Sequence, residues 1–157
     1  MTISEVSYKH ALGRFATGVC VVTMAGSDGR VAGVTISSFT SVSIDPPLVL
    51  FCLGRKNEAL IRAARVAQFA INILADNQED ISEGFAWQAP EKLAGIAWRS
   101  GETGAPIIDG CLAALECAIE TIYEGGDHLI VVGRVLRLEA GRGRPLIRYC
   151  GRYARLS

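Results

Sequence analysis

Hydroxyl side chains are concentrated between residues 35 and 41, around one aromatic residue, Phe39. The hydroxyl residues are Thr35, Ser37, Ser38, Thr40 and Ser41. Small hydroxyl side chains leave the backbone N–H groups accessible and add donors and acceptors of their own. The segment could therefore line a flat ligand with polar edges. It could equally be a Ser/Thr-rich edge strand, because β-propensity and loop chemistry favour the same residue types.

A basic loop, Gly54-Arg-Lys-Asn57, follows the apolar segment 48–53. Asn57 could cap a helix running to about residue 65, because its side chain can accept a hydrogen bond from the first helical turn. Such a loop, with Arg55 and Lys56 beside a helix N-terminus, is a plausible phosphate site. The alternative is an ordinary solvated turn, which spacing alone favours.

Asp127 and His128 could also do chemistry. The sequence has no Gly-x-Ser-x-Gly elbow, so acyl transfer has little support. A single histidine at the start of a strand is more often a turn or rim residue than a substrate contact. Near the end of the sequence, Arg152 and Tyr153 could close a pocket or simply end a strand.

Composition excludes several classes of protein. Sixteen basic residues balance sixteen acidic ones without a large basic cluster, so nucleic-acid binding is not expected. Half of the residues are hydrophobic and the mean hydropathy is +0.28, yet no apolar run approaches the length of a membrane span. We therefore expect a large core, or an apolar surface buried in a homodimer, in a single domain of residues 1–157.

Cysteine usage and the N-terminal residues bear on the compartment. The five cysteines include no Cys-x-x-Cys pair, and the two histidines lie far from any ligand-like spacing. Neither a disulfide framework nor a metal site is expected, and a reducing cytoplasm fits. Residues 1–5 show no cationic region followed by an apolar one, so no signal peptide is expected.

Apolar periodicity and turn residues predict the order of the elements. Ser4 can cap a helix to about residue 15, and a second helix covers residues 78–85. Residues 86–106 are predicted to form a long irregular loop. Strands are predicted at 19–24, 31–37, 48–53, 69–74, 111–123, 128–138 and 146–149, with turns at 27–30 and 124–127. Six or seven strands with hairpin signals, and no Gly-x-Gly-x-x-Gly after a strand, predict a mainly-β fold, a small antiparallel barrel with short flanking helices.

A set of short motifs extends in order along nearly the whole chain. These are Gly13-Arg-Phe-Ala-Thr-Gly-Val19, Thr35-Ile-Ser-Ser-Phe-Thr-Ser-Val-Ser43, Asp45-Pro-Pro47, Phe51-Cys-Leu53, Phe69-Ala-Ile-Asn72, Phe85-Ala86, Gly126-Asp-His128, Gly133-Arg-Val135 and Gly151-Arg-Tyr153. The ordered set resembles the short-chain flavin reductases, the reductase components of two-component flavin monooxygenases. The resemblance implies an FMN-binding split β-barrel and a homodimer.

The resemblance also implies an activity. Family members use NADH or NADPH to reduce free FMN or FAD, and the reduced flavin passes to a separate monooxygenase. The residues implied in flavin binding are Thr35, Ile36, Ser37, Ser38, Phe39, Thr40, Ser41, Cys52, Leu53, Lys56, Asn57, Phe85 and Ala86. Those implied on the NAD(P)H side are His128, Arg152 and Tyr153. The flavin carries the hydride chemistry, so no side chain is expected to be a chemical catalyst, with His128 as the candidate nearest that role.

One departure from the family pattern and two alternatives remain. Many relatives have Ser or Thr after the lysine of the loop, whereas this chain has Asn57-Glu58, whose acid could repel a phosphate. No basic pair for a 2′-phosphate is evident, which favours NADH.

One alternative is a split-barrel flavoprotein with tightly bound FMN and another electron acceptor. The other is a non-catalytic flavin-binding module.

Overall fold

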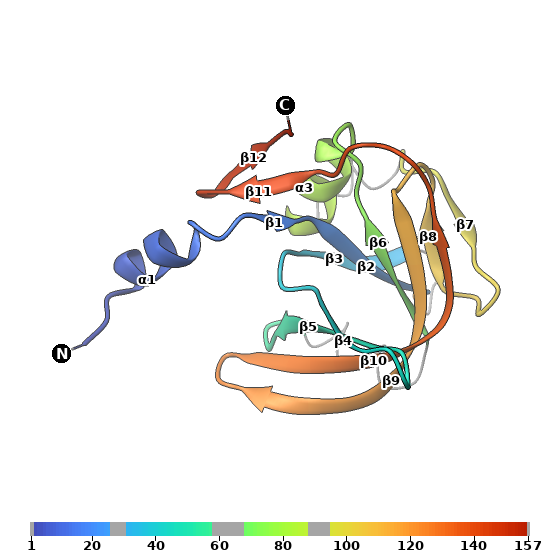
Figure 1. Cartoon of the computed structure of the whole chain (residues 1–157), viewed down its shortest axis with the longest axis horizontal. Coiled ribbons are helices and arrows are strands. Elements are labelled where there is room, and N and C mark those ends of the chain that lie inside the picture. The colour runs from blue at the N-terminus through green and yellow to red at the C-terminus, as the bar shows by residue number, and fades with distance from the viewer. Residues whose placement is uncertain (1, 26–30, 58–67, 88–94, 157) are drawn as a thin grey trace.

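A curled antiparallel sheet dominates the computed structural model, which describes residues 2–25, 31–57, 68–87 and 95–156 (Figure 1). Its strand order is β3-β2-β6-β9-β10-β5-β4, and every pairing is antiparallel. The strands are β2 (Cys20–Ala25), β3 (Val31–Ile36), β4 (Thr40–Ser43), β5 (Leu48–Gly54), β6 (Phe69–Ile73), β9 (Ala113–Gly125) and β10 (His128–Ala140). The predicted mainly-β antiparallel fold with short flanking helices is confirmed.

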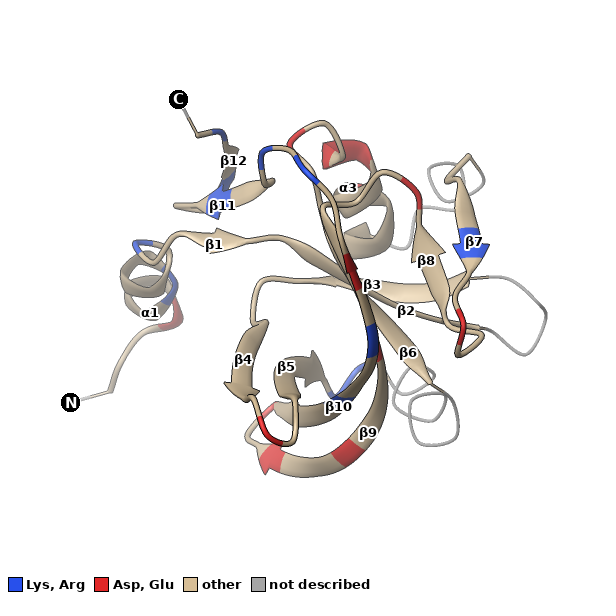
Figure 2. Cartoon of the chain, turned by 45° about the vertical axis from the view of Figure 1, so that its right-hand side comes forward, with Lys and Arg blue, Asp and Glu red and all other residues tan. Residues whose placement is uncertain are grey.

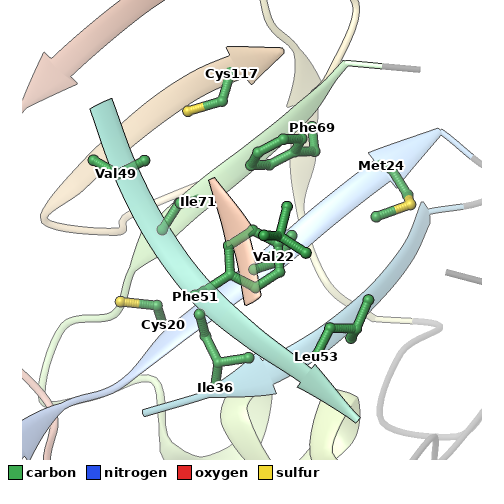
Figure 3. Close-up of a cluster of buried hydrophobic side chains, with 11 residues drawn as sticks. Cys20, Val22, Met24, Ile36, Val49, Phe51, Leu53, Phe69, Ile71 and Cys117 are labelled. Carbon is green, nitrogen blue, oxygen red and sulfur yellow. The ribbon is translucent and has the colours of Figure 1, made fainter. Parts of the chain in front are cut away.

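The main core lies inside the curl of this sheet. Alternate residues of β5, including Phe51 and Leu53, point inward and are almost fully buried, as alternation along a strand with one covered face requires. Figure 3 shows them meeting side chains from β2, β3, β6 and β9. Phe51 and Phe69 pack edge to face with their ring centroids 5.6 Å apart, a favoured geometry for aromatic pairs.

A buried polar network ties a neighbouring hairpin to the sheet. Asn72 of β6 donates through Nδ2 to the carbonyl of Val21 and to the Thr23 hydroxyl, and its Oδ1 accepts from the N–H of Ile108. The Thr23 hydroxyl also donates to the carbonyl of Pro106. Both side chains are fully buried, and every hydrogen bond they make crosses between elements. This network fixes where β8 (Pro106–Ile108) lies on the sheet.

The region 86–106 is more regular than predicted. Helix α3 (Glu79–Trp87) extends into it, and β7 (Trp98–Ser100) pairs with β8. Strands this short carry too little alternation for sequence to reveal them. The intervening turn is held by Glu116, whose carboxylate accepts hydrogen bonds from the backbone N–H groups of Glu102 and Thr103. Burial opposes ionisation of this carboxyl, but these hydrogen bonds outweigh it and lower the pKa of Glu116.

Helix α1 (Glu5–Leu12) stands apart from the sheet at the N-terminal end of the chain (Figure 1). Ser4 caps it as predicted, with Oγ accepting from the N–H of Ser7. The helix ends earlier than predicted, at Leu12. The carbonyl of Gly13, just past its end, accepts a hydrogen bond from the N–H of Cys150, which draws the chain toward the C-terminal hairpin. No residue of α1 is buried.

A small second sheet joins the two ends of the chain. Its order is β1-β11-β12, with β1 (Thr17–Gly18) beside β11 (Ile147–Tyr149) and β12 (Arg152–Ala154) outermost. The turn between β11 and β12 consists of Cys150 and Gly151, with φ of 49° and 76°. Two consecutive positive φ values are typical of a two-residue type I′ hairpin turn. Including β4, β7 and β8, the described residues contain twelve strands rather than six or seven.

Two predicted elements are not tested. The turn 27–30 and all but the first residue of the helix from Asn57 to about residue 65 lie outside the described residues. Glu58, where the sequence departs from the family pattern, lies outside them too. Among the described helices, none is long and apolar enough to cross a membrane.

Candidate functional site

The first cleft, of about 710 Å³, opens between the end of β3, helix α3 and the hairpin β11–β12. Thr35, Ile36 and Ser37 come from the hydroxyl segment, and Ala86 comes from α3. The cleft is also lined by Val19, Glu79, Ser82, Glu83, Trp87, Arg148, Gly151, Arg152 and Tyr153. Its walls therefore combine small hydroxyl groups, charged side chains and aromatic rings.

The second cleft, also of about 710 Å³, lies between α1 and the same hairpin. It contains His128, at the start of β10, and shares Ser37, Arg148 and Gly151 with the first cleft. Its other lining residues are Tyr8, Lys9, Leu12, Gly13, Phe15, Thr17, Tyr149 and Cys150. Because the clefts share these residues, they meet at the hairpin turn and the end of the hydroxyl segment.

Hydrogen bonds through a buried serine hold three walls of the first cleft together. The Thr35 hydroxyl donates to the carbonyl of Ser82, with 2.6 Å between the oxygens. The Ser82 hydroxyl, which is fully buried, lies 2.8 Å from the hydroxyl of Tyr153. This chain of contacts connects β3, α3 and β12. It fixes the phenol ring of Tyr153 in the cleft wall.

Ser38 holds the hydroxyl segment against β5. Its Oγ accepts a hydrogen bond from the N–H of Cys52 at 2.9 Å and also lies 3.4 Å from the Cys52 carbonyl oxygen. The two contacts replace a strand pairing at the point where the chain leaves β3 and has not yet entered β4. Ser38 therefore positions the segment, while the neighbouring Ser37 is exposed to both clefts.

His128 is oriented by its neighbours. Its Nδ1 lies 2.7 Å from a carboxylate oxygen of Asp127, and this hydrogen bond is the main reason that the pKa of Asp127 is lowered. The Nε2 atom lies beside Gly54, within 3.7 Å of the position a Cβ there would occupy, as does the amide nitrogen of Asn57. His128 and the basic loop are therefore neighbours at one end of the β5–β10 pair.

The basic loop is partly engaged by the neighbouring turn. Arg55 donates from Nε to the carbonyl of Gly126 at 2.8 Å and forms an ion pair with Glu124. Lys56 is exposed. The contacts with the turn therefore hold Arg55 but not Lys56.

The predicted residues occupy different environments. Thr35, Ile36, Ser37, Ala86, Arg152 and Tyr153 meet in the first cleft, whereas His128 lies in the second. Phe39 lines a smaller groove of about 270 Å³ and packs on the core. Leu53 and Phe85 belong to the core clusters, each 2% exposed, so their side chains support the site from beneath instead of lining open space. Thr40, Ser41, Cys52, Lys56 and Asn57 line none of these three openings.

Sequence reasoning missed several residues of the clefts. Glu79, Ser82 and Glu83 were not singled out, although they recur at the helical spacing of three to four residues on one face of α3. Arg148 was also missed. It lies between two strand residues of ordinary appearance, so nothing in the local pattern marks it as part of the site.

The first cleft has the properties of a site for a flat organic ligand. Its volume falls within the range of small-molecule sites, about 300–1,000 Å³. Hydroxyl groups along one wall and an anchored phenol on another suit a ring with polar edges, as in a flavin. The fold and the site together define a β-sheet protein with a ligand cleft built from both ends of the chain.

The chain belongs to the flavin reductase-like domain family, whose model matches residues 12–157. It is 39% identical over 154 residues to the flavin-dependent monooxygenase reductase subunit HsaB of Mycobacterium tuberculosis, covering 96% of this chain and 82% of that protein. It is 43% identical over 137 residues to an NADH-dependent FAD reductase of Streptomyces globisporus, covering 84% and 74% of the two chains. The resemblance to flavin reductases is thereby confirmed.

Solved structures give the same family. The fold matches nitrilotriacetate monooxygenase component B from Mycobacterium thermoresistibile with a TM-score of 0.91, 37% identity and coverage of 98% and 87%. It also matches the NADH:FAD oxidoreductase SgcE6 of Streptomyces globisporus, in complex with NAD and FAD fragments, with a TM-score of 0.90, 38% identity and coverage of 98% and 93%.

Proposed function

We propose that this protein is an NADH-dependent flavin reductase, which reduces free FMN or FAD and supplies the reduced flavin to a separate monooxygenase. The observation that carries the proposal is the first cleft, where the hydroxyl segment of a flavin reductase-like chain meets the C-terminal hairpin. Relatives named as the reductase subunit or reductase component of flavin-dependent monooxygenases support the separate oxygenase partner.

The flavin side of the site rests on residues of the hydroxyl segment. Thr35 and Ser37 offer hydroxyl and backbone groups to the polar edges of the ring, and Ala86 leaves room beside it. A bound flavin supplies the capacity to accept a hydride, which no side chain in the cleft possesses. The protein's part is to hold the ring in one orientation and to keep it reachable by the nicotinamide.

The nicotinamide side rests on His128, Arg152 and Tyr153. Asp127 accepts from His128 Nδ1 when that nitrogen carries a proton, which leaves Nε2 available to orient a carboxamide. Tyr153, anchored through Ser82, presents a fixed ring edge, and Arg152 adds a positive charge for an anionic donor. These groups bind and orient the donor.

A homodimer is part of the proposal. Helix α1 has no buried residue in the single chain, and apolar side chains remain exposed along and beside it. Ile3, Val6, Tyr8, Leu12 and Phe15 are each more than half exposed. Tyr8, Leu12 and Phe15 also line the second cleft, so the partner subunit would border that cleft. Apolar surface gathered on one projecting element is typical of a protein–protein interface. We place the protein in the cytoplasm, which the five free cysteines support.

The decisive experiment measures NADH oxidation in air by the purified protein, with and without added FMN or FAD. Oxidation that depends on added flavin and saturates with it is the expected result. A yellow protein that turns over without added flavin would instead be a bound-flavin enzyme with another acceptor. Flavin binding without NADH oxidation would leave a non-catalytic flavin-binding module and refute the proposal.

Replacing His128 tests the nicotinamide side separately. His128→Ala should raise the KM for NADH several-fold while leaving the dissociation constant of FMN, measured by fluorescence quenching, unchanged. His10→Ala is the matched control, because His10 is exposed on α1 and lines neither cleft. Equal NADH kinetics in the two variants would refute the assignment of His128.

A further inference from the structure

Arg148 occupies the junction of the two clefts. It lies on β11 and lines both openings, together with Ser37 and Gly151. Figure 2 shows the arginine-bearing hairpin β11–β12 near the acidic helix α3. A ligand that extends from one cleft into the other must therefore pass Arg148.

The guanidinium of Arg148 rests on a fixed surface. Its central carbon lies 5.1 Å from the ring centroid of Tyr153, its cross-strand partner, within the distance of a cation–π contact. The hydroxyl of that tyrosine is held by the buried Ser82, so the ring cannot swing away freely. A stacked guanidinium loses less freedom on binding a ligand than a mobile one, and its fork of donors fits a phosphate.

The charges around Arg148 favour an anion. Among the described residues Arg148 makes no ion pair, whereas Arg55, Arg99 and Arg134 each pair with a glutamate. In the second cleft Lys9 pairs with Glu5, and His128 is bonded to Asp127. Arg148 is therefore the lining cation of that cleft whose charge no described carboxylate offsets, and it attracts negative charge to the junction.

We propose that Arg148 binds a phosphate group of the nicotinamide dinucleotide where the two clefts meet, and thereby determines the preference of the site for a phosphate-bearing hydride donor. This inference rests on the proposed function. The phosphates then lie at the hairpin turn that both clefts share, and the nicotinamide side includes residues of either cleft, Tyr153 in the first and His128 in the second. The same guanidinium fork serves the pyrophosphate of NADH or the 2′-phosphate of NADPH.

The test compares hydride donors with and without phosphate. NADH, NADPH and 1-benzyl-1,4-dihydronicotinamide, which has no phosphate, are each assayed with saturating FMN on the wild type and on Arg148→Ala. The KM for NADH should rise about tenfold, the low end for a charge-assisted hydrogen bond at an exposed site, while the KM for the benzyl donor stays the same. A rise confined to NADPH would assign the 2′-phosphate as the group bound, and a rise with both would assign the pyrophosphate.

Binding and control variants complete the test. In Arg148→Ala, the dissociation constant of NAD⁺ from the flavin-loaded protein, measured by calorimetry, should rise by the same factor as the KM. It should also depend less on salt than in the wild type. Arg148→Lys should lie between the two proteins, because it keeps the charge but not the planar fork. Arg142→Ala is the control, since Arg142 is an exposed arginine that lines neither cleft.

Three results would overturn the inference. Kinetics of Arg148→Ala equal to those of Arg142→Ala would show that no phosphate is bound there. An equal loss with NADH and the benzyl donor would mean that Arg148 acts only by supporting Tyr153. A rise in the KM of FMN but not of riboflavin would assign Arg148 to the flavin phosphate. A wild type that does not oxidise NADH would instead refute the proposed function.

Discussion

Removal of one hydroxyl, in Tyr153→Phe, should both destabilise the protein and impair NADH use. The change leaves the ring in place but deprives the fully buried Ser82 hydroxyl of a partner at 2.8 Å. A buried polar group left without a partner costs about 1–3 kcal/mol, and the lower half of this range applies because Tyr153 is only half-buried and water can reach it. A loss of about 1–2 kcal/mol corresponds to a Tm lower by roughly 2–8 °C for a chain of this size.

The same change removes the hydrogen bond between the hairpin β11–β12 and α3, so the Tyr153 ring on which Arg148 stacks is held less firmly. We expect the KM for NADH to rise while FMN binding changes less. Tyr123→Phe is the matched control, because Tyr123 is an exposed tyrosine of β9 that lines neither cleft. Tm is measured by circular dichroism, and NADH kinetics are measured on the same samples.

A double-mutant cycle with Ser82→Ala isolates the contact. Ser82→Ala together with Tyr153→Phe should be more stable than the sum of the single losses predicts, because the orphaned hydroxyl is gone. Additive losses, or a Tm of Tyr153→Phe equal to that of Tyr123→Phe, would refute the inference that this hydrogen bond holds the wall of the cleft.

Three further changes test the scaffold. Gly33→Ala should destabilise by about 1–3 kcal/mol, since its Cβ would lie 2.9 Å from the Phe85 ring and 2.7 Å from a backbone carbonyl. Gly18→Ala is the control and should be tolerated, because no atom lies within 4 Å of the added Cβ. Equal urea midpoints for Gly33→Ala and Gly18→Ala would contradict this account. Glu116→Gln should be less stable than wild type at pH 7. Because folding lowers the pKa of Glu116, the stability that its carboxylate contributes is complete above the usual glutamate pKa. This stability is lost as the pH falls through the pKa of the folded state. Urea midpoints of wild type and Glu116→Gln that stay equally far apart down to pH 3 would contradict this role. Asn72→Ala should cost about 1–3 kcal/mol by leaving a buried backbone N–H without an acceptor, and a urea midpoint within error of wild type would exclude this role.

The sequence predicts long elements better than short ones. The strands that became β2, β5, β6, β9 and β10 were predicted because they combine β-branched or apolar residues with turns at their ends. In contrast, β7 and β12 have three residues each, too few to show an alternating pattern, although their partners β8 and β11 are their neighbours in the chain. Similarly, helix α1 was predicted from the Ser4 cap, but its early end depends on a hydrogen bond to the distant Cys150.

The candidate site was predictable in composition but not in geometry. The density of hydroxyls marked residues 35–41, yet only coordinates distinguish Ser38, whose hydroxyl is used by Cys52, from the exposed Ser37. Motif resemblance selected Phe85, but its burial follows from the packing of α3 on the sheet, where Gly33 of β3 leaves room for the ring. Arg148 has no local signal, because its importance comes from where two clefts meet.

The pairing of β1 with β11 also sets an order of assembly. Thr17 lies opposite Arg148, so this contact closes a loop that spans most of the chain. During synthesis, the strands around the main core emerge from the ribosome before β11 and β12 do, and they can fold first. The cleft walls that contain Arg152 and Tyr153 therefore form last. A nascent chain therefore acquires a folded interior before it acquires the cleft that we propose holds NADH.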